Sequence, residues 1–197
     1  MQRAHLKTEL RFLKSQLNPH FLFNTINNLY SLALEKSDKT PDALLKMSSL
    51  LRYFLYECTK DKVPVEKEWS ALLAYQDLFN LSHEQQPNVS LSNDIKSNGM
   101  IEPMILIPLI ENCYKHSGID FEPAAFIDVK IAEENGFLQA DFINSIGNNI
   151  QKENEKNTGI GLAAIQKRLS MHYPGTTPIT IIRNENSFHV HLLIPFS

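Results

Sequence analysis

The chain has 197 residues, of which 43% are hydrophobic, and its 19 basic and 22 acidic side chains leave a net charge of −3. This length and apolar content are enough for a sizeable core divided over one or two domains. The charge balance, without a basic stripe interleaved with aromatic residues, excludes an electrostatic surface for nucleic acid.

The sequence contains no signal for export or for membrane insertion. Its longest apolar run, Met104–Ile110, is far shorter than the roughly 18–20 residues of a membrane span, and no signal peptide is present. Cys58 and Cys113 have neither metal-site nor disulfide-framework spacing, so we expect reduced cytosolic thiols. A helical pattern without a cap follows Met1 almost at once, which we expect of a fragment of a longer chain.

Residues 2–36 are predicted to form one long kinked helix. One apolar stripe ends at Leu17 and a second, out of step with it, begins at Leu22. Pro19 explains the break, because proline lacks an N–H and its ring clashes with the carbonyl group four residues back. His20 follows the kink. It is either a structural helix histidine or a nucleophile, since a neutral imidazole is a good nucleophile at cytosolic pH.

A second helix is predicted to begin at Thr40-Pro41-Asp42, with a capping hydroxyl, proline in the first turn and an early acid. Its apolar seam is formed by Leu44, Met47, Leu51, Phe54 and Cys58. Two such helices joined by a short turn form an antiparallel hairpin. A pair of hairpins packed as a four-helix bundle would bury both seams, so we expect a homodimer through residues 2–59. The alternative is that the seams pack on the rest of the chain.

A charged, proline-bearing connection at 60–64 separates two predicted domains, residues 1–62 and 63–197. The second is predicted to be mixed, with helices on one face of a largely antiparallel sheet, so the fold class is α+β. Its predicted helices are 66–82, 103–117 and one containing Leu162, Ile165 and Leu169; its predicted strands are 89–95, 125–132, 137–143, 179–182 and 188–194. The residues Glu133–Gly136 predict a hairpin turn between the strands 125–132 and 137–143.

The stretch Pro108–Ser117 combines an apolar segment with four polar side chains. On a helix, Asn112 and His116 lie one turn apart, and so do Glu111 and Lys115. The Asn112 carbonyl oxygen could ligate Mg²⁺, and Lys115 or His116 could contact phosphate. The alternative is an amphipathic helix with a surface ion pair.

Thr158-Gly159-Ile160-Gly161-Leu162 places two glycines at the start of a helix. Backbone N–H groups there can approach an anion, and the helix N-terminus adds positive potential. A simple turn is the alternative interpretation. The polar segment 147–157 before it is long for a connection and is typical of a lid or a disordered loop.

These stretches, in this order, resemble the LytS-like sensor histidine kinases. Asn18–Asn24 is similar to their phosphoacceptor box, Leu109–His116 to their N box and Thr158–Leu162 to their second glycine box, with Gln166–Leu169 continuing the match. The resemblance implies a helical dimerisation and phosphotransfer region followed by the ATP-binding fold shared with gyrase, Hsp90 and MutL.

The resemblance also implies roles for individual residues. His20 would accept the γ-phosphoryl group of ATP and pass it to an aspartate of a response regulator. Asn112 would hold Mg²⁺, and Glu111 would assist proton transfer or position the metal's ligands. Gly159 and Gly161 would hinge the lid and bind phosphate. The remaining predicted nucleotide-binding residues are Lys115, His116, Asn144, Thr158 and Leu162. The chain would then be the cytoplasmic part of a membrane-anchored sensor.

The sequence departs from the family pattern in three places. Asn144 stands where the family has an adenine-binding Asp; its amide oxygen can accept the same hydrogen bond without charge assistance. Asp141 is a poor substitute, because it points to the other face of the strand. Asn184–Phe188 lacks the last Gly-Thr box, and Phe21 stands where many histidine kinases have an acid. The rival interpretation is therefore a nucleotide-free module that dimerises and docks the regulator.

Asn24 lies one helical turn after His20. Its amide could orient a water that attacks the regulator's phosphoaspartate, which would make the protein a phosphatase as well as a kinase. Alternatively, it hydrogen-bonds the backbone freed by Pro19.

Overall fold

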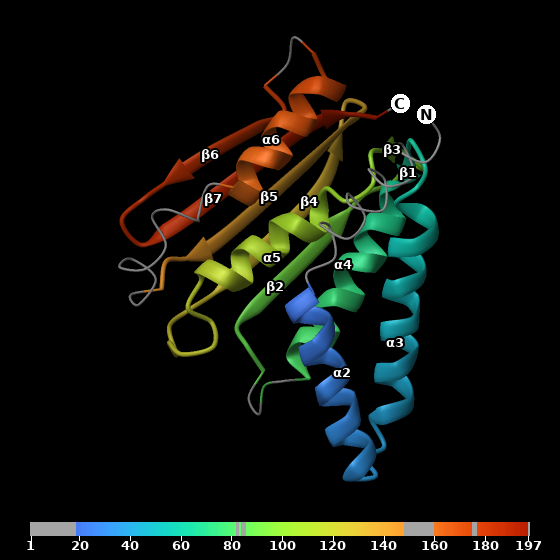
Figure 1. Ribbon diagram of the computed structural model, residues 1–197. Coiled ribbons are helices and arrows are strands. Elements are labelled where there is room, and N and C mark those ends of the chain that lie inside the picture. Colours follow the sequence, from blue (N-terminus) through green and yellow to red (C-terminus); the bar gives the residue numbers. More distant parts are fainter. Residues whose placement is uncertain (1–18, 82, 84–85, 148–159, 175–176, 197) are drawn as a thin grey trace. The chain divides into compact units, whose positions relative to one another are not determined.

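The computed structural model describes residues 19–81, 83, 86–147, 160–174 and 177–196. It divides into two compact units. The first comprises the described part of 1–61 together with Ser70–Glu84, and the second comprises Lys62–Trp69 together with the described residues after 85. Figure 1 labels their elements. Helix α4 (Val65–Asn80) contributes residues to both units, so these units do not coincide with the predicted domains 1–62 and 63–197. The functional boundary between 62 and 63 stays a prediction.

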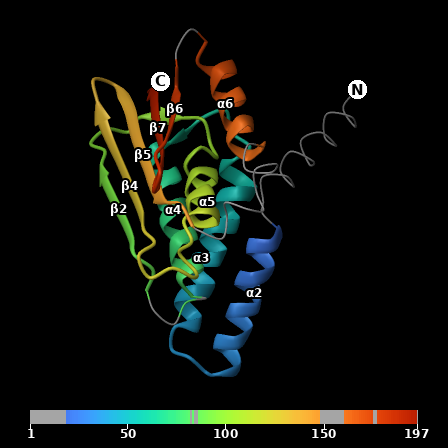
Figure 2. The ribbon, with the colours of Figure 1, turned by 90° about the vertical axis from the view of Figure 1, so that its left-hand side faces the viewer.

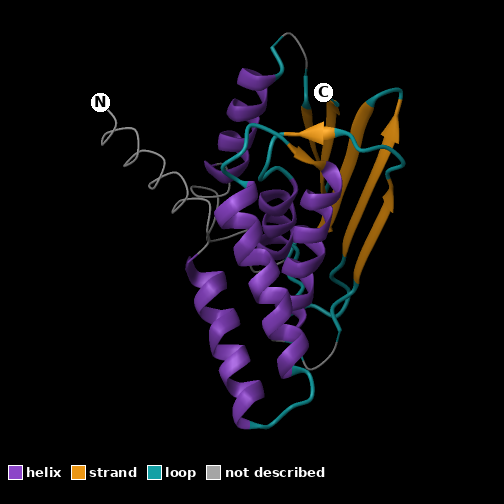
Figure 3. Cartoon of the chain, turned by 90° about the vertical axis from the view of Figure 1, so that its right-hand side faces the viewer, coloured by secondary structure: helices purple, strands orange, loops and turns teal. Residues whose placement is uncertain are grey.

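The first unit contains the predicted helical hairpin. Helix α2 (Pro19–Leu34) and helix α3 (Thr40–Arg52) are joined by a short loop (Figure 3), and α3 continues into a π-helix, η1 (Tyr53–Glu57). The part of the predicted first helix before Pro19, and with it the predicted kink, lies outside the described residues.

The start of α3 corrects one prediction. Lys39 is the N-cap residue and makes no side-chain cap hydrogen bond, and no partner is found for the buried Thr40 hydroxyl among the described residues. Proline in the first turn and the early acid are present as predicted. The Asp42 carboxylate forms a salt bridge of 2.8 Å with Lys46, one turn later in the helix. Lys46 forms a second salt bridge, of 3.0 Å, with Asp77.

The core of the first unit contains part of the predicted seam of the second helix, since Met47 and Phe54 are buried, together with neighbouring positions. Phe21 and Leu29 of α2 are buried, whereas Ile26 and Leu44 are about half exposed. Phe21 stacks on Tyr75 with ring centroids 4.1 Å apart. The hairpin therefore buries one side of each helix within the chain and leaves a second apolar side uncovered.

The second unit has the predicted α+β fold. Its elements are β1 (Val63–Pro64), β2 (Val89–Asp94), β3 (Met100–Ile101), α5 (Leu106–His116), β4 (Ile127–Glu134), β5 (Phe137–Ser145), α6 (Ile160–His172), β6 (Ile179–Arg183) and β7 (Ser187–Pro195). The five-stranded sheet has the order β2-β4-β5-β7-β6; β2 pairs with β4 in parallel and all other pairs are antiparallel. Strands β1 and β3 form a separate two-stranded ribbon.

Strict alternation gives the sheet one buried and one open face. Val129, Phe142 and Val190 lie on the buried face, and α5 and α6 lie on that side of the sheet (Figures 1 and 2). The intervening residues, such as Lys130 and Asp141, lie on the face that is open to solvent. Side chains on adjacent positions of a strand point in opposite directions, so each strand can serve both faces.

A buried carboxylate fixes where α5 begins. Glu68, in the first turn of α4, accepts hydrogen bonds from the backbone N–H groups of Met104 (2.6 Å), Ile105 (3.0 Å) and Leu106 (2.8 Å). Burial raises the pKa of Glu68, and these three donors oppose the shift. Met104 has a positive φ of 60°. The predicted start of this helix at 103 is therefore wrong. The helix starts at Leu106, because the N–H groups of Met104 and Ile105 before it are bound by Glu68. No described helix is both long enough and apolar enough to cross a membrane.

Candidate functional site

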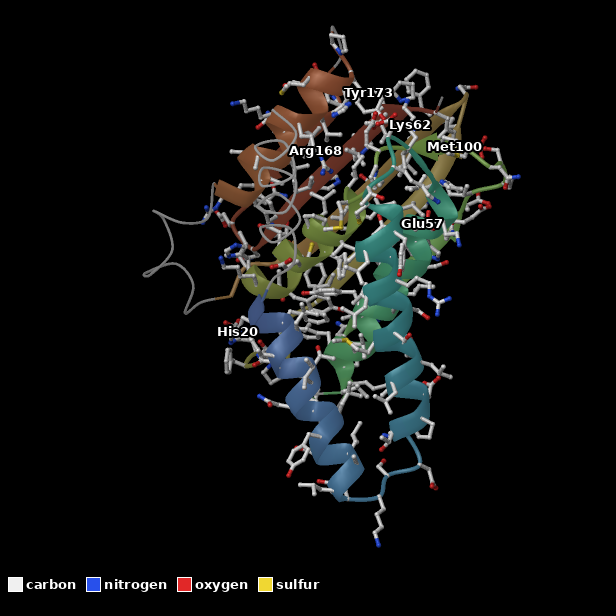
Figure 4. All side chains as sticks on the ribbon, turned by 45° about the vertical axis from the view of Figure 1, so that its right-hand side comes forward. His20, Glu57, Lys62, Met100, Arg168 and Tyr173 are labelled. Carbon is white, nitrogen blue, oxygen red and sulfur yellow. The ribbon has the colours of Figure 1, made fainter. Side chains whose placement is uncertain are left out.

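The predicted phosphoacceptor, His20, lies in the first turn of α2 and is exposed to solvent (Figure 4). The neighbouring Phe21 is buried against Tyr75, so it anchors the helix with His20 on the solvent side. The Asn24 Nδ2 atom lies 3.4 Å from both ring nitrogens of His20. Asn24 thus lies beside the imidazole, one turn along the helix, as predicted.

Thr25 secures the same turn of α2. Its hydroxyl donates to the carbonyl oxygen of Phe21 at 2.8 Å, inside the core of the first unit. This bond and the aromatic stack hold the backbone next to His20. The histidine is consequently presented on an ordered helix rather than on a loop, which favours precise positioning of a reacting group.

Helix α5 carries the four predicted polar side chains. Glu111 and Asn112 are half buried, Lys115 is exposed and His116 is buried, with 8% of its surface accessible. Burial lowers the pKa of His116, and the positive charges of Lys115 and Arg183 lower it further. No partner is found for His116 Nδ1 among the described residues. A neutral imidazole with a free acceptor or donor at this position can contact a bound polar ligand.

Asn144 is fully buried at the end of β5. Its Nδ2 donates to the carbonyl oxygen of Ser145 at 2.6 Å, which leaves Oδ1 as an acceptor without a partner among the described residues. A buried acceptor of this kind is costly unless something satisfies it. The arrangement fits the predicted hydrogen bond from an adenine amine to the Asn144 amide oxygen.

Two hydrogen bonds to backbone carbonyl oxygens join the end of β5 to the end of α5. The Ser145 hydroxyl donates to the carbonyl oxygen of Ser117 at 2.7 Å, and the N–H of Gly147 donates to the carbonyl oxygen of His116 at 3.1 Å. These bonds place Asn144 and His116 at one end of the second unit. The structure therefore brings together residues that are separated in sequence and that were predicted to bind the same nucleotide.

The predicted glycine box falls partly outside the described residues. Helix α6 begins at Ile160, so a helix opens there as predicted, with Gly161 in its first turn. Leu162 is buried on the α6 face that also contains Ile165 and Leu169. Thr158, Gly159 and the polar segment before them are not among the described residues, so their predicted contacts with phosphate stay predictions.

Asp141 does not replace the missing acid at the adenine position. It lies on the open face of the sheet, as predicted, whereas Asn144 lies on the buried face. Its carboxylate is engaged by His189 and His191 of β7 at 2.7 and 2.8 Å. Asn184 and Ser187 close the β6–β7 turn through a backbone hydrogen bond of 2.9 Å, in the place where the family has its last Gly-Thr box.

Sequence reasoning missed a polar cluster around Glu102. The Tyr173 hydroxyl donates to the buried Glu102 carboxylate, and Lys62 and His172 lie 3.9 and 3.7 Å from it. Arg168 of α6 donates to the carbonyl oxygen of Met104. Figure 4 labels Lys62, Arg168 and Tyr173. These contacts join α6 to the segment before α5. No local sequence pattern predicts them, because the partners are distant in sequence.

Comparison with known proteins supports the resemblance. A histidine kinase family model matches residues 8–87. The chain is 27% identical to the sensor protein LytS of Staphylococcus epidermidis RP62A in an alignment 209 residues long, which covers all of this chain and 35% of that protein. It is 28% identical over 173 residues to the sensor histidine kinase/phosphatase LytS of Staphylococcus aureus MRSA252, covering 82% of this chain and 30% of that protein.

Solved structures of histidine kinases also align with the chain. The Acinetobacter baumannii histidine kinase AdeS aligns over 98% of each chain with 15% identity and a TM-score of 0.47. The two LytS proteins are longer than this chain, which spans about a third of the length of these curated relatives. On its phosphoacceptor box, its N box and its similarity to LytS along the whole sequence, the chain resembles the LytS-like sensor histidine kinases.

Proposed function

We propose that this chain is the catalytic portion of a sensor histidine kinase, which transfers the γ-phosphoryl group of ATP to His20 and then to an aspartate of a response regulator. The observation that carries the proposal is the setting of His20, exposed on an ordered helix between Pro19 and the buried Phe21. An exposed imidazole is open to in-line attack on a phosphoryl group, while the anchor behind it limits helix motion.

The second unit would bind the nucleotide. The unpartnered buried oxygen of Asn144 is an acceptor for the adenine amine, and the half-buried Asn112 offers a carbonyl oxygen to Mg²⁺. When bound, Mg²⁺ would neutralise charge on the transferring phosphate. Lys115 and His116 would contact phosphate oxygens, as would backbone amides of Gly159 and Gly161.

Phosphoryl transfer asks for positioning and charge neutralisation rather than elaborate covalent chemistry. The imidazole nitrogen of His20 forms a bond to phosphorus as the bond to the bridging oxygen of ATP breaks, and ADP leaves. The imidazole proton passes to a base, for which Glu111 is the proposed group. The phosphoryl group then moves from His20 to a carboxylate oxygen of the regulator.

The proposal extends to partners and location. The uncovered apolar side of the hairpin supports a homodimer in which two hairpins form a four-helix bundle. LytS relatives are named sensor proteins, and the chain spans about a third of their length. The resemblance to the LytS-like sensor kinases supports the further proposal that it functions as the cytoplasmic part of a membrane-anchored sensor.

The test is incubation with Mg²⁺ and γ-labelled ATP. We expect the label to appear on the chain, to be lost in acid and to survive base, as a phosphohistidine does. His20→Gln should abolish it without changing the circular dichroism spectrum. His172→Gln, which removes a half-exposed histidine in the second unit, is the matched control and should keep it. An undiminished label in His20→Gln contradicts the assignment.

Nucleotide titration separates this proposal from the nucleotide-free docking module. We expect saturable, Mg²⁺-dependent ATP binding that Asn112→Asp weakens. Asn144→Leu should also weaken binding, because it removes the acceptor proposed for adenine. Binding that neither substitution changes would assign both residues to the structure alone, and absent binding with normal regulator docking would favour the rival function.

A further inference from the structure

The open face of the sheet carries a cluster that the proposed kinase activity does not use. Asp141 on β5 lies directly opposite His191 on β7, and His189 lies two residues away on the same strand. His189 Nε2 and His191 Nδ1 lie 2.7 and 2.8 Å from the same atom, Asp141 Oδ1. One ligand-capable atom from each residue thus falls within 4.8 Å of the others.

The backbone holds these three side chains together. Residues two apart on a strand point to the same face, so His189 and His191 form a pair. The β5–β7 register runs unbroken from Phe137↔Pro195 to Ser145↔Ser187, which fixes Asp141 against that pair. The buried residues between them set the register, because a slip by one position would expose the core. The cluster therefore lies on rigid elements and not on a loop.

The cluster is separate from the residues proposed to bind nucleotide. Phe142 and Asn144 of β5 and Val190 of β7 face the buried side, under the helices, whereas the cluster faces away from them. Its side chains are 34% (Asp141), 25% (His189) and 33% (His191) exposed. They are sheltered enough to be ordered and open enough for an ion to enter from solvent.

Two imidazole nitrogens and one carboxylate oxygen are the ligand set that zinc and similar ions prefer. We propose that Asp141, His189 and His191 bind a divalent transition metal ion of the zinc type, with water completing the coordination. Without metal, each ring donates an N–H to Asp141. When the ion enters, each neutral imidazole keeps its single proton on its other nitrogen, so the facing nitrogen offers a lone pair.

One neighbour opposes cation binding and thereby sharpens the test. Lys130 on β4 lies directly opposite Asp141 on the same face, and it is exposed. Its positive charge repels a metal ion, although solvent screens that repulsion. Lys130→Gln should therefore tighten metal binding severalfold without altering the ligands.

The experiment is titration of the purified chain with Zn²⁺ by calorimetry and with Co²⁺ by visible absorption, in the absence of nucleotide and Mg²⁺. We expect one tight site per chain, with a Co²⁺ spectrum of low coordination number. Asp141→Asn and the double variant His189→Gln/His191→Gln should each weaken binding by at least about tenfold. His172→Gln is the matched control and should bind as the parent does.

Nuclear magnetic resonance of histidine-labelled parent protein keeps the proposal testable if a variant fails to fold. Zn²⁺ should shift His189 Nε2 and His191 Nδ1, the two nitrogens that face Asp141, while leaving the resonances of His20 and His172 in place. Absence of tight binding, equal binding by the double variant, or metal-induced shifts confined to other histidines would each overturn the site. None of these outcomes depends on kinase activity, so the site stands or falls apart from the proposed function.

Discussion

The amide of Asn24 lies beside the phosphoacceptor ring, at 3.4 Å from both nitrogens of His20. If Asn24 orients water for attack on the regulator's phosphoaspartate, Asn24→Ala should slow regulator dephosphorylation by roughly 10²-fold or more, a few kcal/mol of lost positioning. The melting temperature should change little, because the side chain is exposed. The measurement is the decay of purified phosphorylated regulator. Joint loss of stability and of every activity would instead assign Asn24 to support of the helix backbone.

His116 makes stability depend on pH. Burial, Lys115 and Arg183 lower its pKa below the usual value near 6.5, so the unfolded chain binds the proton more readily than the folded chain. The free energy of unfolding gained from neutral His116 is therefore present above pH 6.5 and is lost as the pH falls through the lowered pKa. Urea unfolding of His116→Gln should show a shallower loss on acidification than the parent.

A parental slope in His116→Gln would mean that other groups cause the acid sensitivity. The same buried ring is also a proposed phosphate contact, so its substitution should be tested for ATP binding separately.

At the scale of elements, the β4–β5 hairpin depends on its two-residue turn. Asn135 and Gly136 both have positive φ, 52° and 79°, as a tight turn between right-twisted strands requires. No atom lies within 4 Å of a Cβ added to Gly136. Gly136→Ala should therefore cost about 1 kcal/mol of unfolding free energy from backbone strain alone. Urea unfolding measures this, and Asn135→Gly, which suits the same φ, should cost less. A neutral Gly136→Ala would show that the turn rearranges.

The same hairpin shows what sequence could predict. Glu133-Glu134-Asn135-Gly136 between β-rich runs predicted both strands and the turn, because an Asn-Gly pair acts locally through its own backbone preferences. The start of α5 could not be predicted in this way. It depends on Glu68, whose three bonded N–H groups lie more than thirty residues away in sequence. Thr40 was mistaken for a cap because Lys39 takes that position.

The same distinction between local and distant partners separates the polar residues that the sequence predicted from those that it did not. His20, Asn24, Asn112 and His116 were predicted from short motifs, since each motif lies within one or two helical turns. The Asp141–His189–His191 cluster was not, although His189 and His191 show the spacing of a strand pair. Their partner is fixed only by the β5–β7 register, which pairs residues fifty positions apart. A site whose residues lie within one short motif can be predicted from the sequence, whereas a site formed by residues of different strands can be found only once the strand pairing is known.

At the scale of the whole molecule, the uncovered side of the hairpin predicts a homodimer. Phe23, Ile26, Tyr30 and Leu34 of α2 are exposed in the single chain, between 51% and 67%. Such an apolar stripe is typical of an association surface. The double substitution Ile26→Glu/Tyr30→Glu should convert the dimer to a monomer in analytical ultracentrifugation, because a dimer interface would bury the added charges. Phe121→Glu, at a more exposed position in the second unit, is the control. A parent that sediments as a monomer contradicts the prediction.

Helix α4 has a practical consequence for dividing the chain into fragments. The helix is continuous from Val65 to Asn80, yet its residues after Trp69 belong to the first unit, where Leu72, Tyr75 and Leu78 are buried. A fragment cut at residue 63 would carry that apolar surface without α2 and α3 to cover it. We expect such a fragment to bind a hydrophobic dye and to form oligomers on gel filtration, and Tyr75→Gln/Leu78→Gln to restore a monodisperse peak. A soluble, dye-free fragment without these substitutions would show that the second unit can cover this helix by itself.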